Sequence, residues 1–317
     1  MRVILGPMEG VIDALMRELL TEINDYDLCV TEFIRIVDQR LPTRVFKRFC
    51  PELDHHCLTP SGTPVRIQLL GQDPIWMAEN AVKALELGSH GIDLNFGCPA
   101  KTVNKNRGGA ALLKDPEAIY NVIHSAREAI GKEATLSAKV RLGWDDPADA
   151  EEIYDAVANA GASEIVVHAR TKEDGYKAEK IKWERLGELN KNQRLPLIAN
   201  GEIWNYQDGQ KCQQMTNSED LMICRGALAT PNLGNVVKNN QPPMSWSELL
   251  ELLDKYSQYE LAGYKSLYFP NRLKQWLSYL KRSYPEAHTL FSDIRRLTTQ
   301  EAILPILQQH REKNSDI

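Results

Sequence analysis

Residues 65–94, VRIQLLGQDPIWMAENAVKALELGSHGIDL, carry the pattern that decides the fold class. An apolar, β-branched run at 65–70 is followed by a segment at 74–87 in which apolar residues recur at spacings of three and four. A second short apolar run follows at 91–94. This order predicts a strand, a helix and a second strand, which is the unit that connects parallel neighbours in a sheet.

The same alternation continues on both sides of this stretch, up to about residue 230. We expect strands at 3–5, 28–31, 65–70, 91–94, 136–140, 164–167, 197–199 and 221–223, with helices such as 74–87, 115–130 and 148–160 between them. These units predict an α/β protein whose strands close into a (β/α)8 TIM barrel. A doubly wound open sheet is the alternative, but it would need a glycine-rich fingerprint after its first strand, where this chain reads GPMEG.

The chain after residue 233 has a different pattern. A linker that reads NNQPP at 239–243 is followed by helical patterns at 246–260, 272–283, 288–297 and 299–313. We therefore expect two domains, a TIM-barrel domain over 1–240 and a small all-helical domain over 241–317. Within the second, the segment 271–282 is basic and contains Trp276 and Tyr279. It is either a grip for a phosphate backbone or an ordinary solvated helix face, and charge alone does not separate the two.

Composition excludes several classes of protein. The chain of 317 residues has 43% hydrophobic and 26% charged residues, as is ordinary for a globular enzyme. The apolar stretch at 3–5 is too short for a signal peptide or a membrane span, so we expect a cytoplasmic protein without membrane contact. The six cysteines have no CxxC spacing, which indicates neither a metal site nor a disulfide framework. A net charge of -5 argues against a globally basic nucleic-acid binder but allows a local basic face.

Polar residues lie within or directly after nearly every expected strand. In chain order the segments are Pro7-Met8-Glu9, Gln68, Asn95, Lys139 with Arg141, His168, Asn200-Gly201-Glu202 and Cys224-Arg225-Gly226. The carboxyl ends of the strands of a TIM barrel meet at one mouth. A single polar strand end is usually a cap or a turn former, but their coincidence around the barrel indicates a functional site.

The residues that follow the last two strands predict a phosphate site. Loops at these positions of a TIM barrel commonly bind phosphate, and glycine with arginine supplies close backbone approach and fixed donors. The amides of Gln68 and Asn95 and the ammonium group of Lys139 are suited to a planar heterocycle with carbonyl groups. Flavin mononucleotide (FMN) meets both requirements. An aldolase with Lys139 as Schiff-base nucleophile is the alternative, and it would leave the long loop after the fourth strand without a role. His168 is either a member of this site or an ordinary strand-end histidine.

That loop runs from Phe96 to about Ala110 and contains Cys98. Loops of this length without structure of their own are often lids, and we expect Gly108-Gly109 to give hinge freedom. Lys101, Lys105 and Arg107 make the loop positive. A thiol at such a position can donate a proton or attack as a thiolate, and it can equally be a structural residue.

A set of motifs, taken in order, resembles one family, the tRNA-dihydrouridine synthases. The motifs are Gly6-Pro7-Met8-Glu9-Gly10, Asn95-Phe96-Gly97-Cys98-Pro99, Lys139-Val140-Arg141, His168-Ala169-Arg170-Thr171, Ala199-Asn200-Gly201 and Arg225-Gly226-Ala227. The similarity spans the whole chain and is greatest to the bacterial branch called DusC, which acts on position 16 of the tRNA D-loop. It implies an FMN enzyme that uses NADPH to reduce the C5–C6 double bond of a uridine. Reduced FMN would give hydride to C6, and Cys98 would protonate C5.

The resemblance also implies roles for individual residues. The FMN site would contain Pro7, Met8, Glu9, Gln68, Lys139, His168, Asn200, Gly201, Glu202, Cys224 and Arg225. Asn95 would touch the flipped base. Contacts to tRNA would come from Arg35, Tyr176, Arg272, Lys274 and Tyr279. One departure is Cys224, where many relatives have glycine.

The expected partner is tRNA, bound by a cytoplasmic monomer. Two other functions stay open at this point. One is a small-molecule FMN reductase of the dihydroorotate dehydrogenase type, which would not need the basic helical tail. The other is a non-catalytic RNA-binding protein that keeps a relic barrel.

Overall fold

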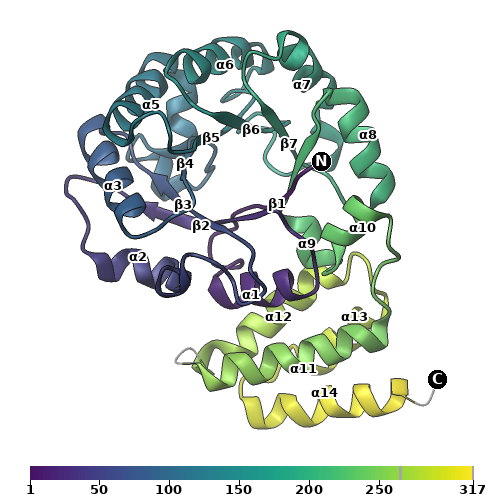
Figure 1. The fold of residues 1–317 in the computed structure, drawn as a ribbon. Helices are drawn as coiled ribbons and strands as arrows, with labels where there is room; N and C mark the ends of the chain where they lie inside the picture. The colour runs from purple at the N-terminus through teal and green to yellow at the C-terminus, as the bar shows by residue number, and fades with distance from the viewer. Residues whose placement is uncertain (264–265, 316–317) are drawn as a thin grey trace.

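Eight parallel strands close into a barrel in the order in which they occur along the chain (Figure 1). They are β1 (Val3–Leu5), β2 (Leu28–Arg35), β3 (Val65–Leu70), β4 (Ile92–Asn95), β5 (Leu136–Arg141), β6 (Glu164–His168), β7 (Leu197–Asn200) and β8 (Asp220–Ile223). Closure is completed by the pairing of β1 with β8. The computed structural model describes residues 1–263 and 266–315, and it confirms the TIM barrel that the strand–helix alternation predicts.

The strands agree with the expected ones except at their ends. Four strands run one residue further, to Asn95, Arg141, His168 and Asn200. These polar residues stay in register, since Asn95 pairs with Lys139, Arg141 with His168, and His168 with Asn200. The ladder therefore holds the polar strand ends at one level of the barrel. The second strand was expected to end at residue 31 but runs to Arg35, past an irregularity between Val30 and Phe33.

Helices cover the outside of the barrel and make up the tail (Figure 1). They are α1 (Ala14–Glu22), α2 (Thr43–Phe49), α3 (Pro74–Glu86), α4 (Lys101–Asn104), α5 (Pro116–Ile130), α6 (Ala150–Asn159), α7 (Trp183–Leu189), α8 (Tyr206–Thr216), α9 (Arg225–Ala229), α10 (Leu233–Asn239), α11 (Trp246–Ala262), α12 (Phe269–Leu280), α13 (Glu286–Ile294) and α14 (Gln300–Ser315). Local sequence sets their starts, because Asp73 and Asp115 cap α3 and α5 and a proline follows each cap. Helix α6 begins two residues later than expected, since residues 147–149 form a 3₁₀ turn.

The tail consists of helices, as expected, and lies against one side of the barrel (Figure 1). A capping box of Ser245 and Glu248 starts α11. Helix α12 packs on α9, where the buried indole of Trp276 donates to the carbonyl oxygen of Leu228 at 3.1 Å. This packing places the basic segment of the tail beside the end of the last barrel unit.

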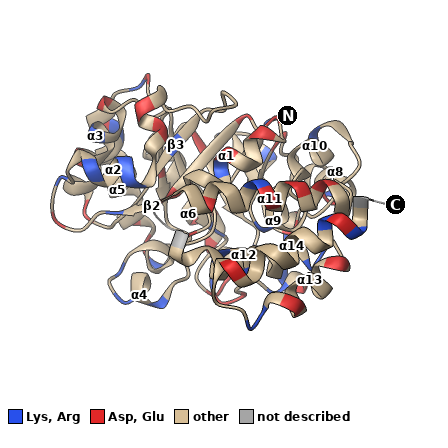
Figure 2. Ribbon diagram, turned by 90° about the horizontal axis from the view of Figure 1, so that it is seen from below, with Lys and Arg blue, Asp and Glu red and all other residues tan. Residues whose placement is uncertain are grey.

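The loop after β4 is not without structure, so that expectation was wrong. It contains α4, around which Figure 2 shows basic residues, and a 3₁₀ turn at Gly109–Lys114. Gly109 has φ +58°, and a Cβ atom there would lie 3.0 Å from the carbonyl oxygen of Cys98. The glycine therefore permits close packing against the cysteine segment.

In the described part of the chain, no helix has the length and apolar character needed to cross a membrane.

Candidate active site at the barrel mouth

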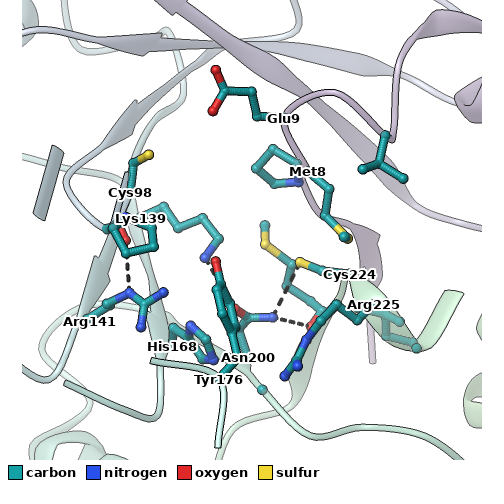
Figure 3. Close-up of a pocket in the computed structure, with 18 of the residues that line it drawn as sticks. Met8, Glu9, Cys98, Lys139, Arg141, His168, Tyr176, Asn200, Cys224 and Arg225 are labelled. Atoms are coloured by element: carbon teal, nitrogen blue, oxygen red, sulfur yellow. Dashed lines mark hydrogen bonds between the residues drawn. The ribbon is translucent and has the colours of Figure 1, made fainter. Parts of the chain in front are cut away.

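A cavity of about 490 Å³ opens at the carboxyl ends of the strands, a volume typical of small-ligand sites. The expected site residues that line it are Pro7, Met8, Glu9, Gln68, Asn95, Cys98, Lys139, His168, Tyr176, Asn200, Gly201, Glu202, Cys224, Arg225 and Tyr279. Figure 3 shows several of them facing the same space from different strands. The carboxyl ends of the strands therefore bring together residues that lie far apart along the chain, as expected for a TIM barrel.

One wall of the cavity is positively charged. Lys139 donates from Nζ to Oδ1 of Asn200 at 3.2 Å, and Arg141 and His168 stand at the ends of the neighbouring strands β5 and β6. Burial lowers the pKa of Lys139. Burial, followed by the charges of Arg141 and Lys139, also holds the pKa of His168 well below its ordinary value. The imidazole is therefore neutral at pH 7, and the wall favours an electron-rich ring edge or carbonyl oxygens.

The turns after β7 and β8, which adjoin this wall, fit a phosphate group. Gly201 has φ +122°, and a Cβ atom there would lie 2.8 Å from Ile181 and 2.9 Å from the ring of His168, so only glycine fits. Helix α9 starts directly after Cys224 without a side-chain cap, which leaves its first N–H groups available. Arg225 and Gly226 from this turn line the cavity.

A carboxylate organises the arginines beside these turns. One oxygen of Glu202 accepts from Arg170 and from Arg225, both at 2.6 Å, and the other accepts from Nε1 of Trp204 at 2.8 Å. Arg170 is fully buried, and its Nε and Nη1 atoms have no hydrogen-bond partner. Two guanidinium groups share a single carboxylate, so the charge here has a positive excess that suits an anion.

Cys98 lies partly buried in the cavity wall, on the segment that follows β4. Burial raises the pKa of its thiol above the ordinary value, the Ala100 N–H acts in the opposite direction, and the carboxylate of Glu9 raises it further. The thiol is therefore protonated at neutral pH. A protonated thiol beside the cavity is suited to donate a proton and is poorly suited to attack as a thiolate.

A chain of amides supports the cysteine segment from below. Oδ1 of Asn95 accepts from the backbone N–H groups of Gly97 at 2.9 Å and Cys98 at 3.0 Å. Nδ2 of Asn95 donates to Gln68 at 2.8 Å, and Gln68 in turn donates to the buried carboxyl of Asp93 at 2.7 Å. Asn95 and Gln68 therefore already form hydrogen bonds within the protein. Each would contact a ligand through the amide N–H that these bonds do not use.

The other expected tRNA residues lie outside the cavity. Arg35 is exposed at the end of β2. Lys274 donates to the carbonyl oxygen of Leu297 at 3.0 Å. Arg272 pairs with Asp13 at 2.8 Å and with Glu260, and its side chain is only 14% exposed. In this conformation its charge is balanced within the protein.

The reasoning from sequence missed one residue of the cavity wall, Trp204, and one set of ion pairs. Trp204 also lies in the cavity wall, where Arg225 approaches its ring at 5.4 Å and Arg282 at 3.6 Å. An aromatic residue so close to the Gly201 turn was the available signal. The pairing of Glu202 with Arg170 and Arg225 had no signal, because it depends on how two loops meet.

The family model for dihydrouridine synthase (Dus) matches residues 4–314. The chain belongs to the dihydrouridine synthase family. It is 59% identical over 313 residues to the tRNA-dihydrouridine(16) synthase of Vibrio vulnificus, covering 99% of this chain and 98% of that one. It is 56% identical over 308 residues to the enzyme of the same name from Escherichia coli K12, covering 97% and 98%. The match includes the helical tail, which a small-molecule FMN reductase of the dihydroorotate dehydrogenase type would not need. This dihydrouridine synthase is thus a member of a flavin-dependent oxidoreductase family.

Solved structures agree on the fold of this dihydrouridine synthase. A 2-naphthoyl-CoA reductase complex superposes with a TM-score of 0.58 at 13% identity, over 76% of this chain and 50% of that one. A histamine dehydrogenase from Rhizobium sp. 4-9 gives 0.55 at 14%, over 75% and 46%. At such low identity the likeness concerns the barrel alone.

Proposed function

We propose that this dihydrouridine synthase reduces the C5–C6 double bond of uridine 16 in the tRNA D-loop, with FMN as cofactor and NADPH as reductant. The choice of position 16 rests on the names of the relatives, whose sequences match nearly the whole chain. The observation that carries the chemistry is a protonated thiol, Cys98, in the wall of a cavity whose lining also fits a phosphate.

The cavity residues fit FMN. The phosphate would lie at Gly201, the start of α9 and Arg225, where the glycine cradle and the positive excess favour it. Lys139, His168, Asn200 and Gln68 would hold the ring system. The remaining residues of this part of the wall are Pro7, Met8, Glu9, Glu202 and Cys224. When bound, FMN would supply hydride to C6 of the uracil.

Cys98 would give its proton to C5 on the same base. A raised pKa keeps the proton on sulfur until the reaction needs it, and the amide chain from Asp93 through Gln68 and Asn95 holds the backbone that carries the thiol. The base must leave its stack to reach this depth, and Asn95 would contact it there.

The tRNA would reach the mouth across the barrel and the tail. Tyr176 and Tyr279 stand at the cavity, while Arg35 and Lys274 offer positive charge outside it. Arg272 would take part only if it exchanged a carboxylate partner for a phosphate. In this scheme residues 1–240 form the catalytic domain and residues 241–317 the tRNA-binding domain, and we expect the enzyme to act as a monomer in the cytoplasm.

The test starts from a strain without any dihydrouridine synthase activity. Purified wild-type protein should show flavin absorbance that matches FMN on release, and with NADPH it should form dihydrouridine at position 16 of unmodified tRNA. Cys98→Ala should keep FMN and its reduction by NADPH but lose about 10²–10⁴-fold in product formation. Protein that stays colourless after FMN addition would contradict the flavin site, and near-normal product from Cys98→Ala would remove the proton-donor role.

A further inference from the structure

Arg141 has a position that the proposed chemistry does not use. It is the last residue of β5, it is 2% exposed, and its guanidinium lies between the loop after β4 and the loop after β6. Nε donates to the carbonyl oxygen of Gly97 at 2.8 Å. Nη1 donates to the carbonyl oxygens of Thr171 at 3.1 Å and Gly175 at 3.2 Å. One side chain therefore joins two loops that line the same cavity.

The bond to Gly97 completes a clamp directly beside the cysteine. Asn95 accepts from the N–H of Gly97 and from that of Cys98, and Arg141 binds the carbonyl oxygen of Gly97. That carbonyl belongs to the peptide unit whose N–H is that of Cys98. Both polar groups of this peptide are therefore held from the barrel, one by β4 and one by β5, so its rotation is blocked.

The second loop bears Tyr176, the exposed aromatic residue of the cavity wall. Its ring centroid lies 5.3 Å from the guanidinium carbon of Arg141, and the residue before it, Gly175, is one of the bonded carbonyls. Displacement of Arg141 would release the thiol segment and the Tyr176 loop together.

Only a guanidinium fits this task. Its donors are fixed in one plane and point in different directions, so Nε and Nη1 reach carbonyls on separate loops at once. A lysine ammonium would carry the same charge at a single point and could not hold both loops at these distances.

We infer that Arg141 is a positioning residue that fixes the separation between the Cys98 thiol and the Tyr176 wall of the cavity. This inference rests on the proposed function, in which Cys98 donates the proton. A proton donor displaced by about 1 Å can lose about 100-fold in rate, so the clamp would act on the rate of reduction rather than on cofactor binding.

A matched arginine provides the control. Arg127 on α5 is also buried and also bonds backbone carbonyls, those of Gly161 at 2.8 Å, Gly131 at 2.6 Å and Ala134 at 2.8 Å. Its partners lie next to the starts of β5 and β6, at the end of the barrel opposite the cavity. Arg127→Lys removes a comparable fork, so it measures the general cost of losing such bonds.

The experiment compares Arg141→Lys, Arg141→Gln and Arg127→Lys with the wild-type holoenzyme. The measurements are FMN content, the rate of Cys98 alkylation by iodoacetamide followed on its own peptide by mass spectrometry, and single-turnover dihydrouridine formation. Both Arg141 variants should keep FMN and form product about 10- to 100-fold more slowly. Arg141→Lys, which keeps the positive charge that lowers the pKa of the thiol, should also alkylate Cys98 several-fold faster. Arg127→Lys should match the wild type in alkylation and in turnover.

Several results would overturn the inference. Wild-type alkylation and turnover in Arg141→Lys would show that charge alone suffices. Slower turnover with unchanged alkylation would mean that Arg141 contacts the substrate. A loss of FMN and stability in Arg141→Lys and Arg127→Lys alike would mean that Arg141 only stabilises the fold. The alkylation rate needs no tRNA, so it decides on the clamp even if Cys98→Ala disproves the proton-donor role.

Discussion

Buried cations at the start of the barrel strands and the two cations of β5 at the mouth are held in opposite ways. At the end where the strands begin, Arg66 pairs with Glu164 at 2.5 Å, and Arg2 bridges Glu164 at 2.8 Å and Asp220 at 2.7 Å. At the mouth, Lys139 donates to an amide and Arg141 to backbone carbonyls. In the described part of the chain, neither of these two cations forms an ion pair with a carboxylate.

This difference separates stability from function within one fold. A buried cation that has a carboxylate partner is costly to disturb but offers nothing to a ligand. A buried cation without one is destabilising by itself, and its charge is available to a ligand that supplies the missing negative groups. We therefore expect the reaction at the mouth, in agreement with the general rule for these barrels.

The largest effect is expected at the end where the strands begin, because the buried cations there have carboxylate partners. Glu164→Gln leaves the buried Arg66 without its charge partner, so the free energy of unfolding in urea should fall by about 3 kcal/mol or more. FMN bound per folded molecule should not change. Exposed Glu151, which pairs with Arg185, is the control, and Glu151→Gln should cost well under 1 kcal/mol. Equal losses in the free energy of unfolding of the two variants would show that the buried pair of Arg66 and Glu164 matters no more than an exposed one.

A smaller effect is expected at the mouth, and on binding instead of folding. Arg225→Ala should weaken FMN binding to the apoprotein by about 10- to 100-fold, because one charge-assisted contact to the phosphate is lost. Flavin fluorescence quenching measures this affinity. Urea stability without FMN should change little, and a large loss of stability would show that Arg225 acts chiefly through its bond to Glu202.

The pH dependence of the reaction sharpens the same comparison. Burial and Glu9 raise the pKa of Cys98, so the proton stays on sulfur through neutral pH and the rate should fall only in the alkaline range. Removal of a negative neighbour makes the thiolate easier to form. Glu9→Gln should therefore move this alkaline fall to lower pH in single-turnover measurements. A shift to higher pH, or none, would exclude Glu9 as a neighbour that controls the thiol.

The smallest effect is expected on the tail. Lys274→Glu should raise the KM for tRNA a few-fold and reduce the salt dependence of binding by about one counterion. FMN content and kcat should stay near the wild-type values. Lys191→Glu, at an exposed position before β7, is the matched control at the other end of the barrel. An equal change in both variants would mean that net charge, rather than a local surface, governs tRNA affinity.

Most of the barrel could be predicted because its strands are short apolar runs that alternate with amphipathic segments. The strand ends were placed one residue short for a physical reason. Asn95, Arg141, His168 and Asn200 are polar, so they interrupt the apolar pattern, yet their backbones continue the ladder. The same polar residues then face the cavity. A polar residue after an apolar run therefore indicated a residue of the cavity wall, and it did not mark the end of the strand.

The loop after β4 and the tail show where local patterns fail. The glycines of the loop read as hinge residues, whereas Gly109 is required by close contact with the Cys98 segment. Arg272 reads as a basic residue free to bind phosphate, whereas it pairs with Asp13, which is 259 residues away along the chain. Neither contact has a local pattern, because each forms only when distant segments meet.

The sequence by itself determined the barrel, the helical tail and the polar residues that gather at the mouth, since these follow from periodicity and from the parallel direction of the strands. Only the tertiary structure decided which polar groups are already engaged. It balanced Arg66 and Arg272 with carboxylates and left Lys139 and Arg141 without them. Pairing of buried charges depends on distances of a few ångströms between chain-distant atoms, and those distances are set by packing.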